Sequence, residues 1–156
     1  MDHARIVVGV NHTPAAEAAL RWALAKAERV GCSVTALHVF DEAERADLAM
    51  ERDPEHEEVE AHSRAQARVR EIVSQSGTDI PVTFTFTHGN VAAELAAAAR
   101  SGTALVVGQP QRDHHRRLVR DLALEAPCPV VAVTEFGHAT TCGLTESKPD
   151  PADKVS

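Results

Sequence analysis

The sequence predicts an α/β protein in which an open, five-stranded parallel sheet carries helices on both faces. Short apolar segments alternate with longer segments of helical periodicity, a pattern that requires parallel strands joined by right-handed crossovers. The segment 5–10, RIVVGV, is apolar throughout, which is typical of a strand buried on both faces. The segment 81–88, PVTFTFTH, instead alternates between apolar and threonine side chains, which favours a position at an edge of the sheet.

The first helix is expected over residues 14–30. Thr13 is a suitable N-cap, because its hydroxyl can accept a hydrogen bond from the first turn. Pro14 fits the first helical position, where its fixed φ is already helical and its missing N–H has no partner to lose. Gly31 can adopt the left-handed conformation that ends a helix.

A second strand is expected over residues 33–40, and a second helix from about 56 to 76, where Gly77 ends it. The apolar face of that helix is formed by Val59, His62, Val69, Ile72 and Val73. The intervening segment, 41–56, is acidic and contains Pro54, so we expect a surface loop or a partly ordered excursion.

The second half of the chain continues the alternation. Gly89 and Asn90 turn the chain into an alanine-rich helix over 91–101. The fourth and fifth strands are expected at 103–108 and 129–134, with a short helix between them at about 116–125. After Phe136 the periodicity is lost, so we expect one domain, 1–136, and a disordered tail, 137–156.

The composition excludes several classes of function. A formal net charge of -7 argues against general binding to nucleic acid or to acidic membranes. Cys32, Cys128 and Cys142 are odd in number and have no metal-site spacing, so we expect a reduced, cytoplasmic protein. The adjacent His114 and His115 lack the further ligands that a closed metal site needs. No nucleophile-elbow pattern occurs, and we expect neither a metal nor an enzyme.

Taken in order, several short motifs resemble those of the universal stress protein family. They are RIVVGV at 5–10, NHTP at 11–14, LRWAL at 20–24, ALHV at 36–39, Gly89-Asn90, LVVG at 105–108 and APCPVV at 126–131. The resemblance covers residues 4–135. It implies a five-stranded parallel sheet of strand order 3-2-1-4-5, which agrees with the edge position derived above for 81–88.

Many members of that family bind ATP through a glycine signature that begins at the end of the fourth strand. Gly108 matches its first glycine, but Gln111 stands at the second, and the last pair falls near Arg116-Arg117. The loop is also about five residues too short. Asn11 replaces an aspartate that contacts the nucleotide, and Val39 matches a position whose backbone contacts adenine. The resemblance therefore implies that ATP is not bound in the usual way.

The candidate ligand-binding residues are Val10, Asn11, Val39, Gly108, Arg116 and Arg117. For two of these features a structural alternative stays open. Asn11 could contact a ligand or could satisfy its own backbone in the turn before the helix. The basic segment from Arg112 to Arg117 could bind an anion through its side chains, or it could be a solvated loop paired with Asp113, Asp121 and Glu125.

The resemblance implies a homodimeric stress-response or regulatory protein that acts by binding a partner or an alternative small ligand. An alternative is a divergent member that binds ATP with Mg²⁺ through arginine and histidine side chains. A third class, a nucleotide hydrolase, would need a phosphate loop after the first strand, where the short Asn11–Pro14 segment has no glycine. We expect the dimer to form through the apolar fifth strand at an uncovered sheet edge, by Val130, Val131, Val133 and Phe136.

Overall fold

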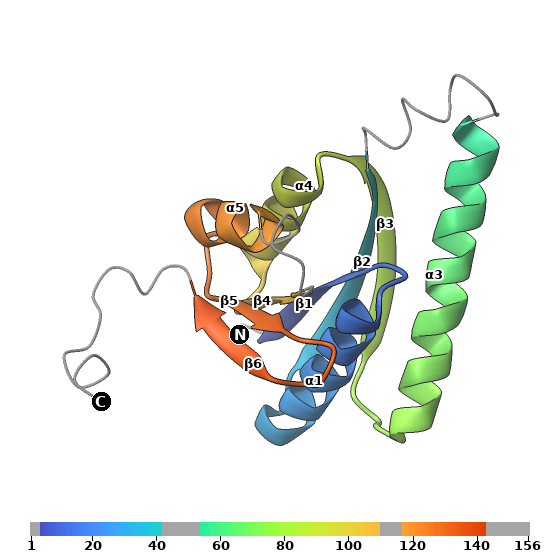
Figure 1. The fold of residues 1–156 in the computed structure, drawn as a ribbon. Helices are drawn as coiled ribbons and strands as arrows, with labels where there is room; N and C mark the ends of the chain where they lie inside the picture. Colours follow the sequence, from blue (N-terminus) through green and yellow to red (C-terminus); the bar gives the residue numbers. More distant parts are fainter. Residues whose placement is uncertain (1–3, 42–53, 110–116, 143–156) are drawn as a thin grey trace.

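The computed structural model describes residues 4–41, 54–109 and 117–142 of the 156-residue chain. Its strands form one sheet in the order β3-β2-β1-β4-β5-β6, with helices on both faces (Figure 1). The strands are β1 Arg5–Val10, β2 Ser33–Asp41, β3 Val82–Gly89, β4 Ala104–Gly108, β5 Val130–Val133 and β6 Ala139–Cys142. The helices are α1 Pro14–Val30, α3 Pro54–Ser76, α4 Val91–Ala98 and α5 Arg117–Glu125, and a 3-10 turn, Ala99–Ser101, follows α4.

The first five strands are parallel and have the predicted order, but the prediction of five strands was wrong. The sixth strand, β6, pairs antiparallel with β5, with Val131 opposite Thr141 and Val133 opposite Ala139. A tight turn makes this pairing possible. Gly137 adopts a φ of 87°, and its N–H donates to the Thr134 carbonyl over 2.8 Å.

The expectation of a disordered tail from 137 is therefore wrong for Ala139–Cys142, while residues 143–156 lie outside the described part of the chain. The sequence argument required apolar spacing, and β6 has none. A strand of this kind is instead held by backbone hydrogen bonds to its neighbour, and threonine favours extended backbone.

Each face of the sheet carries its own apolar layer. On one face α1 and α3 cover the side chains of Ile6, Val8 and Val10. On the other face α4 and α5 cover Val7 and the inward side chains of β4. Because side chains alternate along a strand, β1 supplies both layers, which explains why its sequence is apolar throughout.

The predicted start and end of α1 are confirmed. The Thr13 hydroxyl accepts from the Ala16 N–H over 3.1 Å, and Gly31, with a φ of 75°, donates its N–H to the Ala27 carbonyl over 2.7 Å. The edge position of β3 is also confirmed, with Thr83 and Thr85 exposed. Phe86 belongs to the apolar side of this alternation, yet it is 60% exposed, and its ring lies against that of His62 of α3.

Candidate functional site

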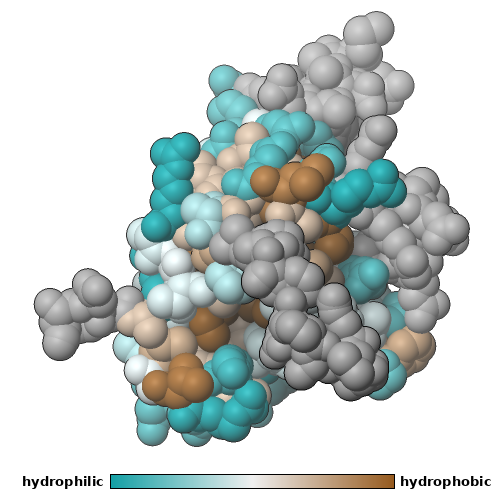
Figure 2. Space-filling view, turned by 90° about the vertical axis from the view of Figure 1, so that its left-hand side faces the viewer, coloured by the Kyte–Doolittle hydropathy of each residue, from teal (hydrophilic) through white to brown (hydrophobic). Residues whose placement is uncertain are grey.

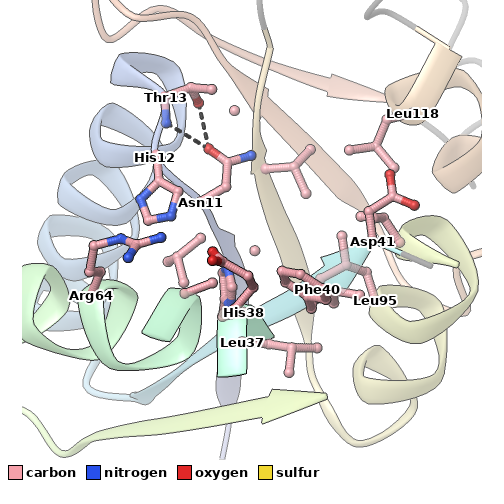
Figure 3. A pocket seen from close by; sticks show the side chains of 18 residues that line it. Asn11, His12, Thr13, Leu37, His38, Phe40, Asp41, Arg64, Leu95 and Leu118 are labelled. Carbon is pink, nitrogen blue, oxygen red and sulfur yellow. Dashed lines mark hydrogen bonds between the residues drawn. The ribbon is translucent and has the colours of Figure 1, made fainter. Parts of the chain in front are cut away.

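A pocket of about 440 Å³ opens at the carboxyl ends of β1, β2 and β4. Strand β1 lies between β2 and β4, so the order in which the chain adds strands to the sheet reverses at β1. In open parallel sheets, ligands bind at the carboxyl ends of the strands at such a point. In Figure 3, Asn11, His12 and Arg64 lie on one side of the pocket and Asp41 and Leu118 on the other. Apolar walls come from Leu37, Val39, Val91, Leu95, Val107 and Leu118.

Asn11 follows β1 directly, makes the turn interaction that the sequence left open, and also lines the pocket. Its Oδ1 accepts from the Thr13 N–H over 2.8 Å and from the Thr13 hydroxyl over 2.6 Å, which is the turn interaction. Its amide nitrogen is turned away from Thr13 and toward the pocket (Figure 3). The turn therefore fixes the side chain in an orientation that offers a donor to a ligand.

Gly108, at the end of β4, is required by packing. A Cβ at this position would lie 2.5 Å from the Ala16 nitrogen and 2.6 Å from the Ala15 carbonyl carbon, both in the first turn of α1. Such contacts involve backbone atoms and cannot be relieved by a rotamer change. The match of Gly108 to the first glycine of a phosphate loop thus has a structural explanation that is independent of phosphate.

A buried chain of histidines joins the pocket to α3. His38 of β2 and His62 of α3 are 4% and 6% exposed, and their Nδ1 atoms lie 2.7 Å apart. The Nε2 of His62 lies 3.2 Å from Glu58 Oε2, and this oxygen is also 3.2 Å from Nδ1 of His88 on β3. His38 is thus an interior residue with a partner, and that partner lies 24 residues away in the chain.

The surroundings of His38 disfavour its charged form. Burial, followed by the nearby positive charges of His62, His12 and Arg64, lowers the pKa of its imidazole to about 4. Glu58 acts in the opposite direction, but its effect is smaller. His38 is therefore a neutral pocket residue near pH 7, able to donate or accept a hydrogen bond according to its tautomer.

Comparison with known proteins establishes the family. The model of the universal stress protein family matches residues 3–134. The chain belongs to the universal stress protein family. No curated protein matches the chain at significant similarity.

Solved structures of universal stress proteins have the same fold. One is UspA from Lactobacillus plantarum, with 21% identity and a TM-score of 0.65 over 85% of this chain and 98% of that one. Another, from Archaeoglobus fulgidus in complex with dAMP, has 20% identity and a TM-score of 0.63 over 85% and 98%. A third, in complex with cAMP, has 12% identity and a TM-score of 0.64 over 86% and 99%.

The structure of this universal stress protein brings together Val10, Asn11, Val39 and Gly108 around one pocket. The side chains of the two candidate arginines are not among those that the structure describes. Arg116 lies outside the described residues, and Arg117 is the first residue of α5, with no described side chain. The arrangement of the basic segment is therefore untested, and the anion-binding hypothesis stays a prediction.

The sequence argument missed His62, Asp41, Glu57 and Arg64, which line or adjoin the pocket. One signal was present: a histidine on the apolar face of the 56–76 helix requires a buried polar partner. Within the described ranges, no group of three or more histidine, cysteine, aspartate or glutamate side chains is arranged to hold a metal ion. None of the helices in the same ranges is both long and apolar enough to span a bilayer.

The residues expected at a dimer interface have different environments. Val130, Val131 and Val133 are 0%, 7% and 0% exposed, whereas Phe136 is 67% exposed. The premise of an uncovered β5 edge is wrong, because β6 is hydrogen-bonded to it. Figure 2 shows the side of the molecule on which β6 lies. Among the described residues on this side, the apolar ones appear at separate places. The homodimer itself stays a prediction.

Proposed function

We propose that this universal stress protein is a stress-response regulatory domain that binds a small ligand of the nucleoside class, without the usual triphosphate loop. The observation that carries the proposal is the 440 Å³ pocket at the carboxyl ends of β1, β2 and β4. Its size falls within the range of about 300–1,000 Å³ that is typical of small-molecule sites. Binding, with no chemical turnover, is the proposed activity.

The chemistry of the pocket wall suits a nucleoside. The apolar side chains of Leu37, Val39 and Leu95 offer a surface for a flat base. The carboxylates of Asp41 and Glu57 are acceptors suited to sugar hydroxyls, and Asn11 adds an amide donor. The nucleotides bound by the two relatives above, dAMP and cAMP, each carry a single phosphate.

A ligand with one phosphate would not require the glycine loop that this chain lacks. The competing function is binding of ATP with Mg²⁺, in which side chains such as Arg116 and Arg117 contact the β- and γ-phosphates. The two functions differ in how affinity depends on the number of phosphates. A loop of arginines should favour ATP strongly over AMP, whereas a nucleoside pocket should bind both with similar affinity.

Isothermal titration with adenosine, AMP and ATP, with and without Mg²⁺, tests the proposal. We expect AMP to bind at one site per chain and ATP to bind no more than about tenfold more tightly. Val39→Trp, which fills the pocket, should abolish AMP binding. Val30→Trp is the matched control, because Val30 is 56% exposed near the far end of α1 and does not line the pocket.

Two outcomes would contradict the proposal. Binding of AMP that is unchanged in a folded Val39→Trp protein would place the ligand elsewhere. A preference for ATP of a hundredfold or more, lost in Arg116→Ala and Arg117→Ala, would favour the arginine-loop alternative.

A further inference from the structure

The His38–His62 contact joins the pocket to the helix that forms one of its walls. His38 lines the pocket, and α3, which carries His62, contributes Glu57, Ala61 and Arg64 to the same pocket. The two Nδ1 atoms are 2.7 Å apart, which is a hydrogen-bond distance. Such a bond needs one Nδ1 with a proton and one without. The contact is therefore compatible with a neutral pair or with one positive charge, but not with two.

The neighbouring carboxylate determines the tautomers of the neutral pair. Because Glu58 Oε2 lies 3.2 Å from His62 Nε2, that nitrogen carries a proton and donates a hydrogen bond to the carboxylate. The Nδ1 of a neutral His62 then accepts a hydrogen bond from the Nδ1–H of His38. One added proton still allows a single Nδ1–H between the two rings. A second added proton places two N–H groups opposite each other.

Burial and the positive groups beside the pair disfavour a second charge at this place, and they outweigh the opposing effect of Glu58. His12, in the loop between β1 and α1, has its ring centroid 6.0 Å from that of His38, and Arg64 of α3 adds a further positive charge. Glu58 is shared with His88 of β3, while Asp41 and Glu57 line the adjoining pocket.

The other rings that lie close to His62 belong to two phenylalanines. The rings of Phe40 and Phe86 lie 6.3 and 4.5 Å from that of His62, between centroids. Phenylalanine rings offer no acceptor for a second N–H, and their cation–π attraction replaces only part of the hydration that a buried second imidazolium loses.

We propose that the His38–His62 contact is a pH-sensitive device that keeps the first half of α3 on the sheet, and that double protonation of the pair releases this part of the helix and opens the pocket wall. The release of α3 follows from the geometry of the pair. The consequence for ligand binding rests, in addition, on the proposed function.

The pH range follows from the environment of His38. In the docked state, in which the first half of α3 lies on the sheet, the pKa of His38 is about 4. In the released state, in which this part of α3 has left the sheet and His38 is solvated, its pKa has the ordinary value of 6.5. Between these two values the released state binds one proton more than the docked state, so acidification favours release. The population of the released state should rise about tenfold per pH unit over this range. Above pH 6.5 both states are neutral at His38, and no dependence is expected.

Hydrogen–deuterium exchange at pH 7.5, 6 and 5, corrected for intrinsic exchange rates, measures the release. In the unmodified protein we expect amides 58–65 to lose protection relative to those of α4, by about tenfold per pH unit below 6.5. The double variant His38→Asn/His62→Asn keeps an amide near each Nδ1 position but cannot titrate, and its α3 protection should not change with pH. His56→Asn, on the exposed side of α3, is the matched control and should behave like the unmodified protein.

Constant protection of α3 between pH 7.5 and 5 in the unmodified protein would overturn the proposal, as would an equal loss in the double asparagine variant. If that variant does not fold, ¹⁵N chemical shifts of the imidazoles in the unmodified protein decide instead. We expect the second protonation of the pair to coincide with the loss of α3 protection. A second protonation with α3 still protected would overturn the proposal.

Adenosine, which does not titrate in this range, tests the consequence for the pocket. Its affinity should fall on acidification in the unmodified protein and stay constant in the double variant. Equal affinity at pH 7.5 and 5 in a protein whose α3 has lost protection would overturn the link to the pocket. If neither adenosine nor AMP binds at any pH, the proposed function fails, while the exchange experiment still decides whether the pair controls α3.

Discussion

Arg68 of α3 binds Glu17 of α1 with two parallel hydrogen bonds. Its Nε donates to Glu17 Oε2 and its Nη2 to Glu17 Oε1, each over 2.8 Å. The Arg68 hydrogen bond lowers the pKa of the Glu17 carboxyl against the opposing effect of burial. This ion pair connects the two helices that cover one face of the sheet, and it fixes α3 at a point further along the helix than His62.

The first prediction concerns this ion pair. Arg68→Lys should lower the Tm slightly, because an ammonium cannot reproduce the two-point contact, and Arg68→Ala should lower it further. Since the pKa of Glu17 is lowered on folding, its contribution is fully present above the pKa of an unfolded glutamate and is lost progressively as the pH falls from that value through the lower pKa of the folded state. Thermal melts at pH 7 and pH 3.5 measure both effects. Arg70→Ala serves as the control. Equal melting of Arg68→Ala and Arg70→Ala at pH 7 would contradict the prediction.

The second prediction concerns the glycine at the end of β4. Gly108→Ala places a Cβ against the backbone of Ala15 and Ala16 and should destabilise the protein by about 1–3 kcal/mol. Gly9→Ala is the matched control in a neighbouring strand, because its nearest contacts are the flexible side-chain ends of Leu95 at 3.1 and 3.2 Å. We therefore expect a smaller loss for Gly9→Ala in urea denaturation. The reverse order of stabilities would refute the argument.

The third prediction concerns β6. Truncation after Gly137 removes the strand paired with β5 and leaves an apolar strand with an open edge. We expect a lower Tm and self-association that increases with concentration, as measured by sedimentation velocity. Truncation after Cys142 retains β6 and is the control. A protein cut at Gly137 that stays as stable and as monodisperse as the control would show that β6 does not protect the edge.

The fourth prediction separates the two roles of Asn11. Asn11→Asp retains an oxygen that can accept from the N–H and hydroxyl of Thr13, so the start of α1 and the Tm should be preserved. Asn11→Ala removes this acceptor and should cost about 1 kcal/mol of stability. Both variants remove the amide donor that faces the pocket. We therefore expect both to change AMP affinity, measured by calorimetry, while only Asn11→Ala melts earlier. Unchanged affinity in both variants would exclude Asn11 from the site.

The features predicted from the sequence are those that depend on local chemistry. The bounds of α1 follow from the cap at Thr13 and the stop at Gly31, and the edge position of β3 follows from its alternating side chains. The strand β6 was missed, because backbone pairing with β5 leaves little trace in side-chain pattern. The His38–His62 contact was missed because it joins a strand to a helix, and neither segment specifies the other in sequence.

The antiparallel β6 also determines how this sheet can be extended. A sheet accepts a further strand only along a side whose backbone N–H and C=O groups face outward. On one side, the parallel array ends at β5, and β6 reverses direction there and occupies those groups. On the opposite side stands β3, eight residues long, paired within the described sheet with β2 alone. The outermost strands of the described sheet are therefore the eight-residue β3 and the four-residue β6. An extended peptide that joins at β5 must first displace β6, whereas at β3 it would lie beside the exposed Thr83 and Thr85.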